Sequence, residues 1–322
     1  MSQSLFSDLS PMSFDPTAVS FGGHEKFPLR YGWLSKGFHA FSENHNIFKS
    51  TTATIDLGVG NNMVQAIKYW LLATQMLRSP KQSVLEVSSI GYFLLDKNTG
   101  VDPYLEDEAT IWLLHWLLAS NPRGATSWFW FFNQFHKSEF TADELSTALN
   151  DFVKDKVDQK KRPAIGTVKN DTQLLTRMYV QSKLVSRKPI EDALDSPLSL
   201  LRMMSQSYNA RSFISKPSDR PGLPIGILGY AVSSLLKSKN TNHLPIETIM
   251  YSNDLFPAPG SVFRLTENNL IEKLERLIQM YPGIFNIRDT SGIHEIYYDG
   301  EEHSPNFFLE QHYAAVEKGE AA

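Results

Sequence analysis

The sequence predicts a mainly α-helical protein with small β wings, in which a winged helix-turn-helix module precedes a helical C-terminal domain that ends in a β-hairpin. Two observations lead to this fold class. A glycine-containing turn joins two helical patterns within residues 51–77, and a strand-like segment follows them. Nearer the C-terminus, an amphipathic helical pattern over residues 266–280 precedes a hairpin pattern over residues 285–298. Helices followed by a hairpin are typical of winged helices, so both halves favour this class.

Residues 51–77 are predicted to form the second and third helices of the helix-turn-helix. Gly58 and Gly60 bracket a tight turn, because glycine adopts a positive φ at little cost. Apolar residues then recur at helical spacing and predict an inward stripe: Met63, Val64, Ile67 and Leu71. Residues that can hydrogen-bond base edges or phosphates in a major groove are expected to face outward: Asn61, Asn62, Gln65, Lys68 and Tyr69. The alternative is an ordinary three-helix core with a polar outer face.

The flanking segments fit the same module. Residues 33–43 predict its first helix. After the third helix, Val84, Leu85 and Val87 alternate as in a strand, and a small-residue turn leads into a short apolar helix ending near residue 95. This order predicts a wing directly behind the DNA-reading helix.

A loop dense in functional groups precedes the module, over residues 21–37. If the protein cleaves a phosphodiester, the candidate catalytic residues are His24, Glu25, Arg30 and Tyr31. His24 or Glu25 would act as base or metal ligand, Arg30 would stabilise phosphate charge, and Tyr31 would position the phosphate or attack it. Lys26 and Lys36 are expected to contact DNA. The alternative is a structural loop whose histidine and arginine satisfy local carbonyls.

Several features of the middle of the chain have a structural interpretation that we prefer. Four carboxylates could form a metal site, but acidic residues also favour the first turn of the helix expected over residues 109–118: Asp102, Glu106, Asp107 and Glu108. His115 is expected in the core. The aromatic run at residues 127–135 is expected to be buried rather than to form a platform for single strands. Thr141 and Glu144 predict a capping box.

The predicted domain organisation is a flexible lead-in over residues 1–20, a winged-helix DNA-binding and catalytic domain over 21–153, a linker over 154–171 and a helical C-terminal domain over 172–322. The linker is placed where the composition becomes basic and poor in apolar residues. Helices are expected over residues 172–183, 197–205, 223–237 and 266–280, and the final hairpin is expected to turn at 289–292. A second winged helix in this half is a further hypothesis.

Composition limits the function. The net charge of −4 indicates that any DNA-binding surface is a local patch. The chain has no cysteine, which excludes disulfides, thiolate metal ligands and cysteine nucleophiles. We find no signal peptide, no apolar stretch long enough for a membrane span, and no standard nucleotide or nuclease motif. The expected location is therefore the cytoplasm, with no membrane partner. The metal ligands are unknown, and a divalent cation such as Mg²⁺ or Mn²⁺ is left open.

Three segments, residues 21–33, 57–70 and 102–116, resemble a bacterial family of unknown function whose genes tend to sit beside those for sulfotransfer proteins of the PAPS-reductase type. The resemblance implies a nickase that opens one strand of double-stranded DNA. It also implies that partner proteins, a cysteine desulfurase and an ATP-using sulfur-transfer enzyme, then place sulfur in the DNA backbone as part of bacterial defence. A chain without cysteine agrees with sulfur being carried elsewhere. The alternatives are a non-catalytic DNA-binding or regulatory subunit and a protein scaffold, and a homodimer is left open.

Overall fold

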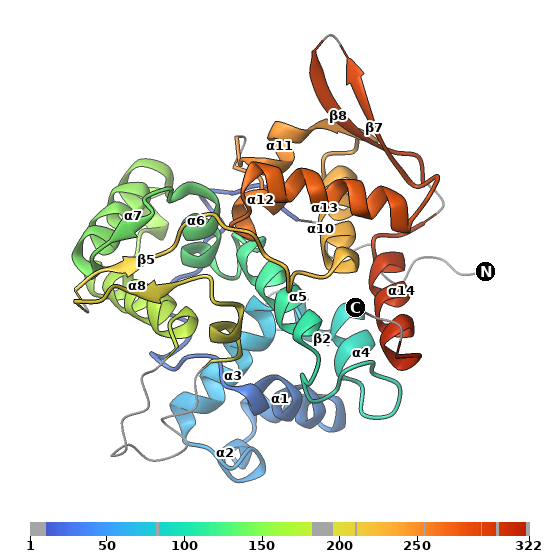
Figure 1. Cartoon of the computed structure of the whole chain (residues 1–322). Coiled ribbons are helices and arrows are strands. Elements are labelled where there is room, and N and C mark those ends of the chain that lie inside the picture. Colours follow the sequence, from blue (N-terminus) through green and yellow to red (C-terminus); the bar gives the residue numbers. More distant parts are fainter. Residues whose placement is uncertain are drawn as a thin grey trace. The chain divides into compact units, whose positions relative to one another are not determined.

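The computed structural model describes residues 11–81, 84–181, 196–209, 211–253, 255–290, 292–300 and 303–319. These residues are mainly helical, with small antiparallel sheets, as the sequence predicts (Figure 1). Two compact units can be distinguished. The first, called here the α1–α8 unit, consists of Asp15–Phe131 and Phe135–Lys216. The second, the α10–α14 unit, consists of Met1–Phe14, Phe132–Gln134 and Pro217–Ala322.

The α1–α8 unit begins with the elements expected for the DNA-reading module. In order they are α1 (Tyr31–Glu43), η1 (Ile47–Lys49), α2 (Ala53–Asp56), α3 (Asn61–Ala73), β1 (Leu77–Lys81), β2 (Val84–Val87) and α4 (Ser89–Leu95). Strands β1 and β2 pair antiparallel as a hairpin. The helices and the strand at residues 84–87 therefore occur in the predicted order, whereas β1 was not predicted. The winged-helix assignment itself stays a prediction.

The turn between α2 and α3 depends on one glycine. Gly58 has a φ of +61°, in the left-handed region that side chains rarely adopt. Gly60, expected to share this role, has a φ of −67° and instead provides the extended N-cap of α3. From there the inward stripe forms as expected for Val64 and Ile67, which are buried, whereas Met63 is half-buried.

The rest of the unit is built around α5 (Glu108–Ala119), of which every residue from Ala109 onward is buried. The other elements are α6 (Thr126–Gln134), β3 (Glu139–Phe140), α7 (Ala142–Lys156), η2 (Gln159–Lys161), α8 (Ile165–Tyr179), η3 (Pro197–Leu201), β4 (Ser205–Gln206) and β5 (Phe213–Ile214). The last three residues of α6 are counted with the α10–α14 unit. The three strands form a small antiparallel sheet in the order β3-β5-β4.

The structural interpretations of this region are confirmed. Asp107 caps α5 by accepting a hydrogen bond from the backbone N–H of Ala109 at 2.8 Å. His115 lies in the core, where its Nδ1 is 2.8 Å from the hydroxyl of Tyr179. The aromatic run of residues 127–135 is buried apart from Gln134. Thr141 and Glu144 form the predicted capping box of α7.

Residues 154–171, the predicted linker, carry the end of α7, η2 and the first half of α8. Helix α8 therefore begins at Ile165, seven positions before the predicted start at Thr172. Whether the two predicted domains fold independently stays a prediction. Of the expected lead-in, residues 1–10 lie outside the described residues, as do residues 182 and 183 of the expected helix.

The α10–α14 unit contains both helices and strands. Its elements are α10 (Ile225–Ser238), β6 (His243–Pro245), α11 (Ile246–Met250), α12 (Pro259–Val262), α13 (Glu267–Met280), β7 (Phe285–Thr290), β8 (Ile293–Tyr298) and α14 (Asn306–Glu317). The strands form an antiparallel sheet in the order β6-β8-β7, in which Ile296 of β8 lies opposite both Leu244 and Ile287. The predicted long helix and final hairpin are confirmed, and the hairpin extends away from α13 and α11 (Figure 1).

Sequence patterns did not predict α14, which packs against α10. Among the described residues, no helix has the length and apolarity that crossing a bilayer requires.

Candidate functional site

The loop before α1 is held from inside by His24. This side chain has no exposed surface, and its Nε2 lies 2.9 Å from the Oδ1 of Asp171 on α8. Its Nδ1 accepts a hydrogen bond from the backbone N–H of Lys26 at 3.0 Å. Since that nitrogen is the acceptor, Nε2 carries the hydrogen and donates it to the carboxylate. Both ring nitrogens of His24 are therefore hydrogen-bonded in this arrangement.

Asp171 gathers donors from three parts of the chain. Besides His24, its carboxylate accepts hydrogen bonds from the backbone N–H of Gly22 at 3.0 Å and from the hydroxyl of Ser127 at 2.6 Å. The Asp171 side chain is 1% exposed, so these bonds replace its hydration. The result is a rigid anchor that ties the loop to α6 and α8.

Two residues next to His24 point to solvent. Glu25 and Lys26 are both exposed and have φ angles of 49° and 66°, in the left-handed region. The bond from the Lys26 backbone to the buried imidazole holds this unusual conformation. A carboxylate and an ammonium group are thereby presented side by side on a fixed turn.

Arg30 and Tyr31, the other candidate catalytic residues, lie at the start of α1. The guanidinium of Arg30 is 5.3 Å from the centroid of the Trp33 ring. Tyr31 is half-buried, and burial together with the nearby charge of Glu108 raises the pKa of its hydroxyl. A raised pKa disfavours the phenolate that an attacking tyrosine would need.

The loop packs directly on α3. The indole N–H of Trp70 donates to the carbonyl of Phe27 at 3.0 Å, and the imidazole of His24 stacks on the Trp70 ring at 6.3 Å. A methyl group added to Gly23 would lie 2.5 Å from the ring of Tyr69. The structure therefore joins the predicted loop and the predicted reading helix into one assembly.

The outward face of α3 agrees with expectation except at one position. Asn61, Asn62 and Gln65 are exposed, and Lys68 is half-exposed. Tyr69 was expected on this face and the expectation is wrong: it is 9% exposed and packs on Trp70 at 4.9 Å. Burial, with the charge of Asp171, raises the pKa of its hydroxyl well above the usual value.

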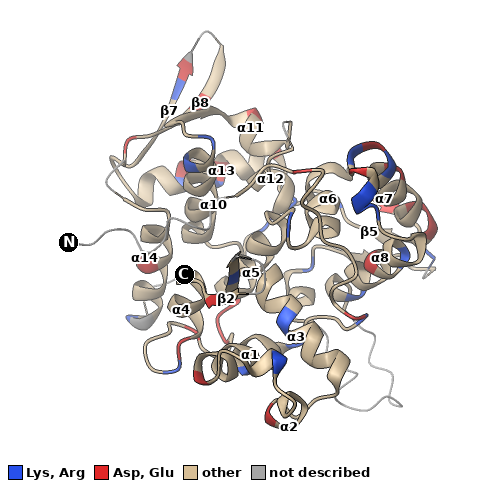
Figure 2. Ribbon diagram, turned by 180° about the vertical axis from the view of Figure 1, so that it is seen from behind, with Lys and Arg blue, Asp and Glu red and all other residues tan. Residues whose placement is uncertain are grey.

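Lys36 extends the exposed polar face. It is exposed on α1, and its ammonium group donates to the carbonyl of Leu57 at 3.3 Å, just before the turn into α3. Together with Lys68, it places basic residues on α1 and α3 of the same unit (Figure 2). We call this surface the α3 face; it comprises Lys36, Asn61, Asn62, Gln65 and Lys68.

Sequence reasoning missed Asp171 and Ser127. Both look like ordinary polar residues of helical segments, and they lie 147 and 103 positions after His24 in the chain. A serine within an aromatic run and an aspartate on a helix are common, so no local pattern marks them as partners of a histidine. Their role is visible only once the chain is folded.

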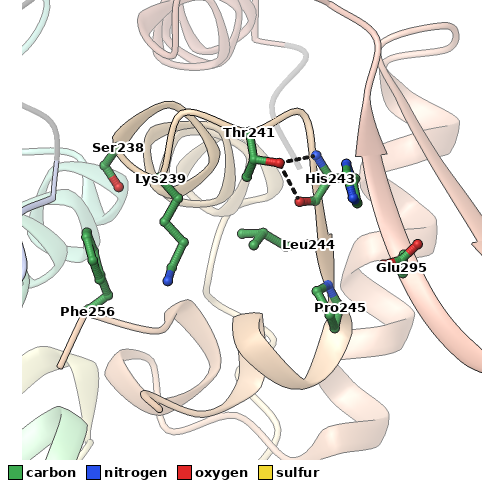
Figure 3. Close-up of a pocket in the computed structure, with 8 residues that line it drawn as sticks. All are labelled: Ser238, Lys239, Thr241, His243, Leu244, Pro245, Phe256 and Glu295. Atoms are coloured by element: carbon green, nitrogen blue, oxygen red, sulfur yellow. Dashed lines mark hydrogen bonds between the residues drawn. The ribbon is translucent and has the colours of Figure 1, made fainter. Parts of the chain in front are cut away.

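A separate groove of about 570 Å³ lies in the α10–α14 unit (Figure 3). Lys239 and Phe256 line one side of it, and His243 lines another. The ammonium of Lys239 lies 4.4 Å from the centroid of the Phe256 ring, and His243 stacks on Tyr297 at 5.1 Å. None of the residues predicted as functional lies in this groove.

Comparison with known proteins identifies one family and two similar structures. The family described as a protein of unknown function, DUF4007, matches residues 21–313. No curated protein matches this chain. A crystal structure of SspB is similar with a TM-score of 0.77 and 26% sequence identity, covering 95% of this chain and 90% of that one. A magnesium-ion-bound crystal structure of SspB shares the fold, with a TM-score of 0.74, 24% identity and coverage of 94% and 96%.

Proposed function

We propose that this chain, which belongs to DUF4007, a family of proteins of unknown function, acts in phosphorothioate modification of the DNA backbone, the role that its similarity to SspB suggests. Its proposed role is that of a nickase, which hydrolyses one phosphodiester of a duplex so that partner proteins can insert sulfur. The observation that carries this proposal is the similarity to SspB over 95% of the chain. The partners would be sulfur-transfer and ATP-using proteins of a defence system. A chain with no cysteine needs them to carry the sulfur.

The proposed DNA contact is the α3 face, with α1 to β2 acting as a winged helix-turn-helix. Amide side chains at Asn61, Asn62 and Gln65 suit base edges, and Lys36 and Lys68 suit phosphates. The first amides of α3 also lack a side-chain cap, which leaves them able to donate to a phosphate. Lys26 would add a further phosphate contact from the neighbouring loop.

Cleavage is assigned to the loop that packs on α3. Glu25 would act as the general base and Arg30 would stabilise charge on the phosphate, with Tyr31 hydrogen-bonded to it as a neutral phenol. His24 would be a positioning residue, because its imidazole is buried and both ring nitrogens are bonded. The anchor at Asp171 would then fix Glu25 relative to the duplex.

A divalent metal ion is a proposed cofactor whose effect on nicking the assay tests. Within the described ranges, no three histidine, aspartate or glutamate side chains converge as a metal site. The described residues therefore offer no cage of protein ligands for magnesium. Magnesium in nucleic-acid enzymes is often held largely by water and substrate phosphates, which is why the assay includes it.

The second candidate is a non-catalytic DNA-binding subunit of the same system. The observation that favours it is the burial of His24, the residue best suited by type to act as a base at neutral pH. In that case the protein would bind the duplex and a partner would open the strand.

Incubating supercoiled plasmid with the pure protein and Mg²⁺ or Mn²⁺ distinguishes the two candidates. The nickase proposal expects open circles, and expects Glu25→Ala and Arg30→Ala to abolish them at an unchanged melting temperature. His24→Ala should lower activity and melting temperature together, since it removes part of the anchor. Intact plasmid together with a duplex gel shift would support the non-catalytic candidate. Equal nicking by the Glu25, Arg30, Tyr31→Phe and His24 variants would exclude the loop as the site.

A further inference from the structure

The α10–α14 unit contains, in order, α10, β6, α11, the short α12, α13, β7, β8 and α14. Without α12 and α14 this order is helix, strand, helix, helix, strand, strand. Its sheet order β6-β8-β7 brings the first strand beside the last. In helix-turn-helix proteins the later helix of the motif is the one that enters the major groove. By position in the chain, α13 would be that helix here.

The charges on α13 oppose this role. Its exposed side chains include three carboxylates, at Glu267, Glu272 and Glu275, and one cation, at Arg276. Helix α11 adds the exposed carboxylate of Glu247. A duplex docked on this surface would bring its phosphates against an excess of negative charge, which raises the free energy of association.

The same surface exposes apolar side-chain area, and its contact with water is unfavourable. Tyr251 and Ile271 are 39% and 40% exposed. Between them lies a groove of about 190 Å³, whose apolar lining includes Ile246, Met250 and Leu270. Binding sites for small molecules usually occupy about 300–1,000 Å³. This groove is smaller, and its size suits one or two side chains of a docked peptide.

The acidic rim of the groove is held in place. The hydroxyl of Tyr251 donates to the Oε1 of Glu267 at 2.7 Å, which links the end of α11 to the start of α13. Glu247 and Glu267 both line the groove, and Glu272 and Glu275 continue the negative charge along α13. An apolar centre with a charged rim is the usual anatomy of a protein-binding surface.

We propose that the α11–α13 surface docks a partner protein through a segment that carries an apolar anchor residue flanked by lysine or arginine. The anchor fills the groove between Met250 and Ile271, and the cations pair with Glu247, Glu267 and Glu272. This surface is distinct from the α3 face and does not depend on whether the chain nicks DNA. The α10–α14 unit therefore recruits protein, although its order of elements resembles that of a DNA-reading module.

Selection of a random peptide library displayed on phage against the full chain tests this surface. The selected peptides are expected to combine an apolar residue with flanking basic residues. A fluorescent synthetic copy of the tightest-binding peptide should bind the Ile271→Glu variant about tenfold more weakly than it binds the unchanged chain. The same loss is expected for the Glu272→Lys, Glu275→Lys double variant. The affinity for the unchanged chain should fall as the salt concentration rises. Glu310→Lys is the matched control, because Glu310 is exposed on α14 of the same unit. It should leave binding unchanged.

Three results would overturn the proposal. The selected peptides could lack an excess of basic residues, or they could bind the Ile271 and Glu272 variants as well as the unchanged chain. The third concerns DNA: Asn268 and Gln279 are outward polar residues of α13, and a loss of duplex affinity in Asn268→Ala or Gln279→Ala would make α13 a DNA-reading helix. Circular dichroism and melting temperature confirm that each variant is folded.

Discussion

Asp171 shows how much of the candidate site depends on one buried side chain. Its carboxylate accepts hydrogen bonds from Gly22, His24 and Ser127 and is almost completely shielded from water. Asp171→Ala leaves these donors buried without an acceptor. We expect it to lower the free energy of unfolding by about 3 kcal/mol, measured by urea denaturation.

Asp155→Ala is the control for this substitution. Asp155 is 70% exposed and pairs with Lys156 at 3.0 Å, so its loss should change stability by less than about 0.5 kcal/mol. An equal effect of the two substitutions would show that the carboxylate of Asp171 does not hold the loop.

Lys273 leads to a prediction about pH. It is 8% exposed, and desolvation lowers its pKa from the usual 10.5 to about 8, with a further contribution from Arg276 that Glu272 opposes. Between pH 8 and 10.5 the unfolded chain binds this proton and the folded chain does not, so the contribution of Lys273 to stability rises with pH across that interval. Below pH 8 the lysine is protonated in both the folded and the unfolded state, so the unfavourable burial of its charge is constant.

Comparing the wild type with Lys273→Met by urea denaturation at several pH values should show the wild type gaining stability relative to the variant from pH 8 to 10.5. A constant difference would contradict the lowered pKa.

For single residues, the sequence predicted which helical positions face solvent better than it predicted which side chains are buried by distant parts of the chain. Asn62, Gln65 and Lys36 reach solvent because their helical positions follow from local periodicity. His24 and Tyr69 turned out to be buried because their neighbours, such as Asp171 and Trp128, come from distant parts of the chain. Periodicity contains no information about such contacts.

At the scale of elements, the α2–α3 turn tests whether backbone conformation positions the α3 face. Gly58 has a φ of +61°, so Gly58→Ala introduces backbone strain of about 1 kcal/mol. Gly32→Ala is the matched comparison: Gly32 lies in the first turn of α1 with open space around it. There alanine should stabilise the protein by about 0.5 kcal/mol. Thermal melts should move in opposite directions, and duplex binding should weaken only for Gly58→Ala. Shifts of the same sign would mean that the turn tolerates a side chain.

Elements with strong local signals were predicted well. Thr141 and Glu144 marked the start of α7, and Thr266 with the apolar stripe that follows marked α13. The start of α8 was missed because its first turns present exposed Ile165, Gly166 and Lys169 and bury only Val168 before Asp171. Such a segment resembles a linker in composition, and it is helical because the rest of α8 packs in the core.

For the whole molecule, composition suggested a division at residues 154–171, whereas residues on both sides of this stretch pack in the α1–α8 unit. A basic, apolar-poor stretch indicates solvent exposure, and a domain boundary at this stretch stays a prediction. The same reasoning applies to charge. A net charge of −4 says nothing about where the individual cations lie. In the structure, Lys26, Lys36 and Lys68 of the α1–α8 unit are exposed or half-exposed.

The charge distribution sets the expected salt dependence of DNA binding. If the duplex docks on the α3 face and the neighbouring loop, three lysines contact phosphates, and the logarithm of the binding constant should fall with the logarithm of salt concentration with a slope of about −3. Lys68→Ala should bring the slope closer to zero by about 1 and weaken binding to all sequences alike. Asn62→Ala or Gln65→Ala should instead reduce base preference with little change in slope, because amides that read bases release no counterions. Lys237→Ala is the control, since Lys237 is exposed on α10 of the other unit. Fluorescence anisotropy across a salt series measures each slope, and a slope unaffected by Lys68→Ala but reduced by Lys237→Ala would move the DNA-binding surface to the α10–α14 unit.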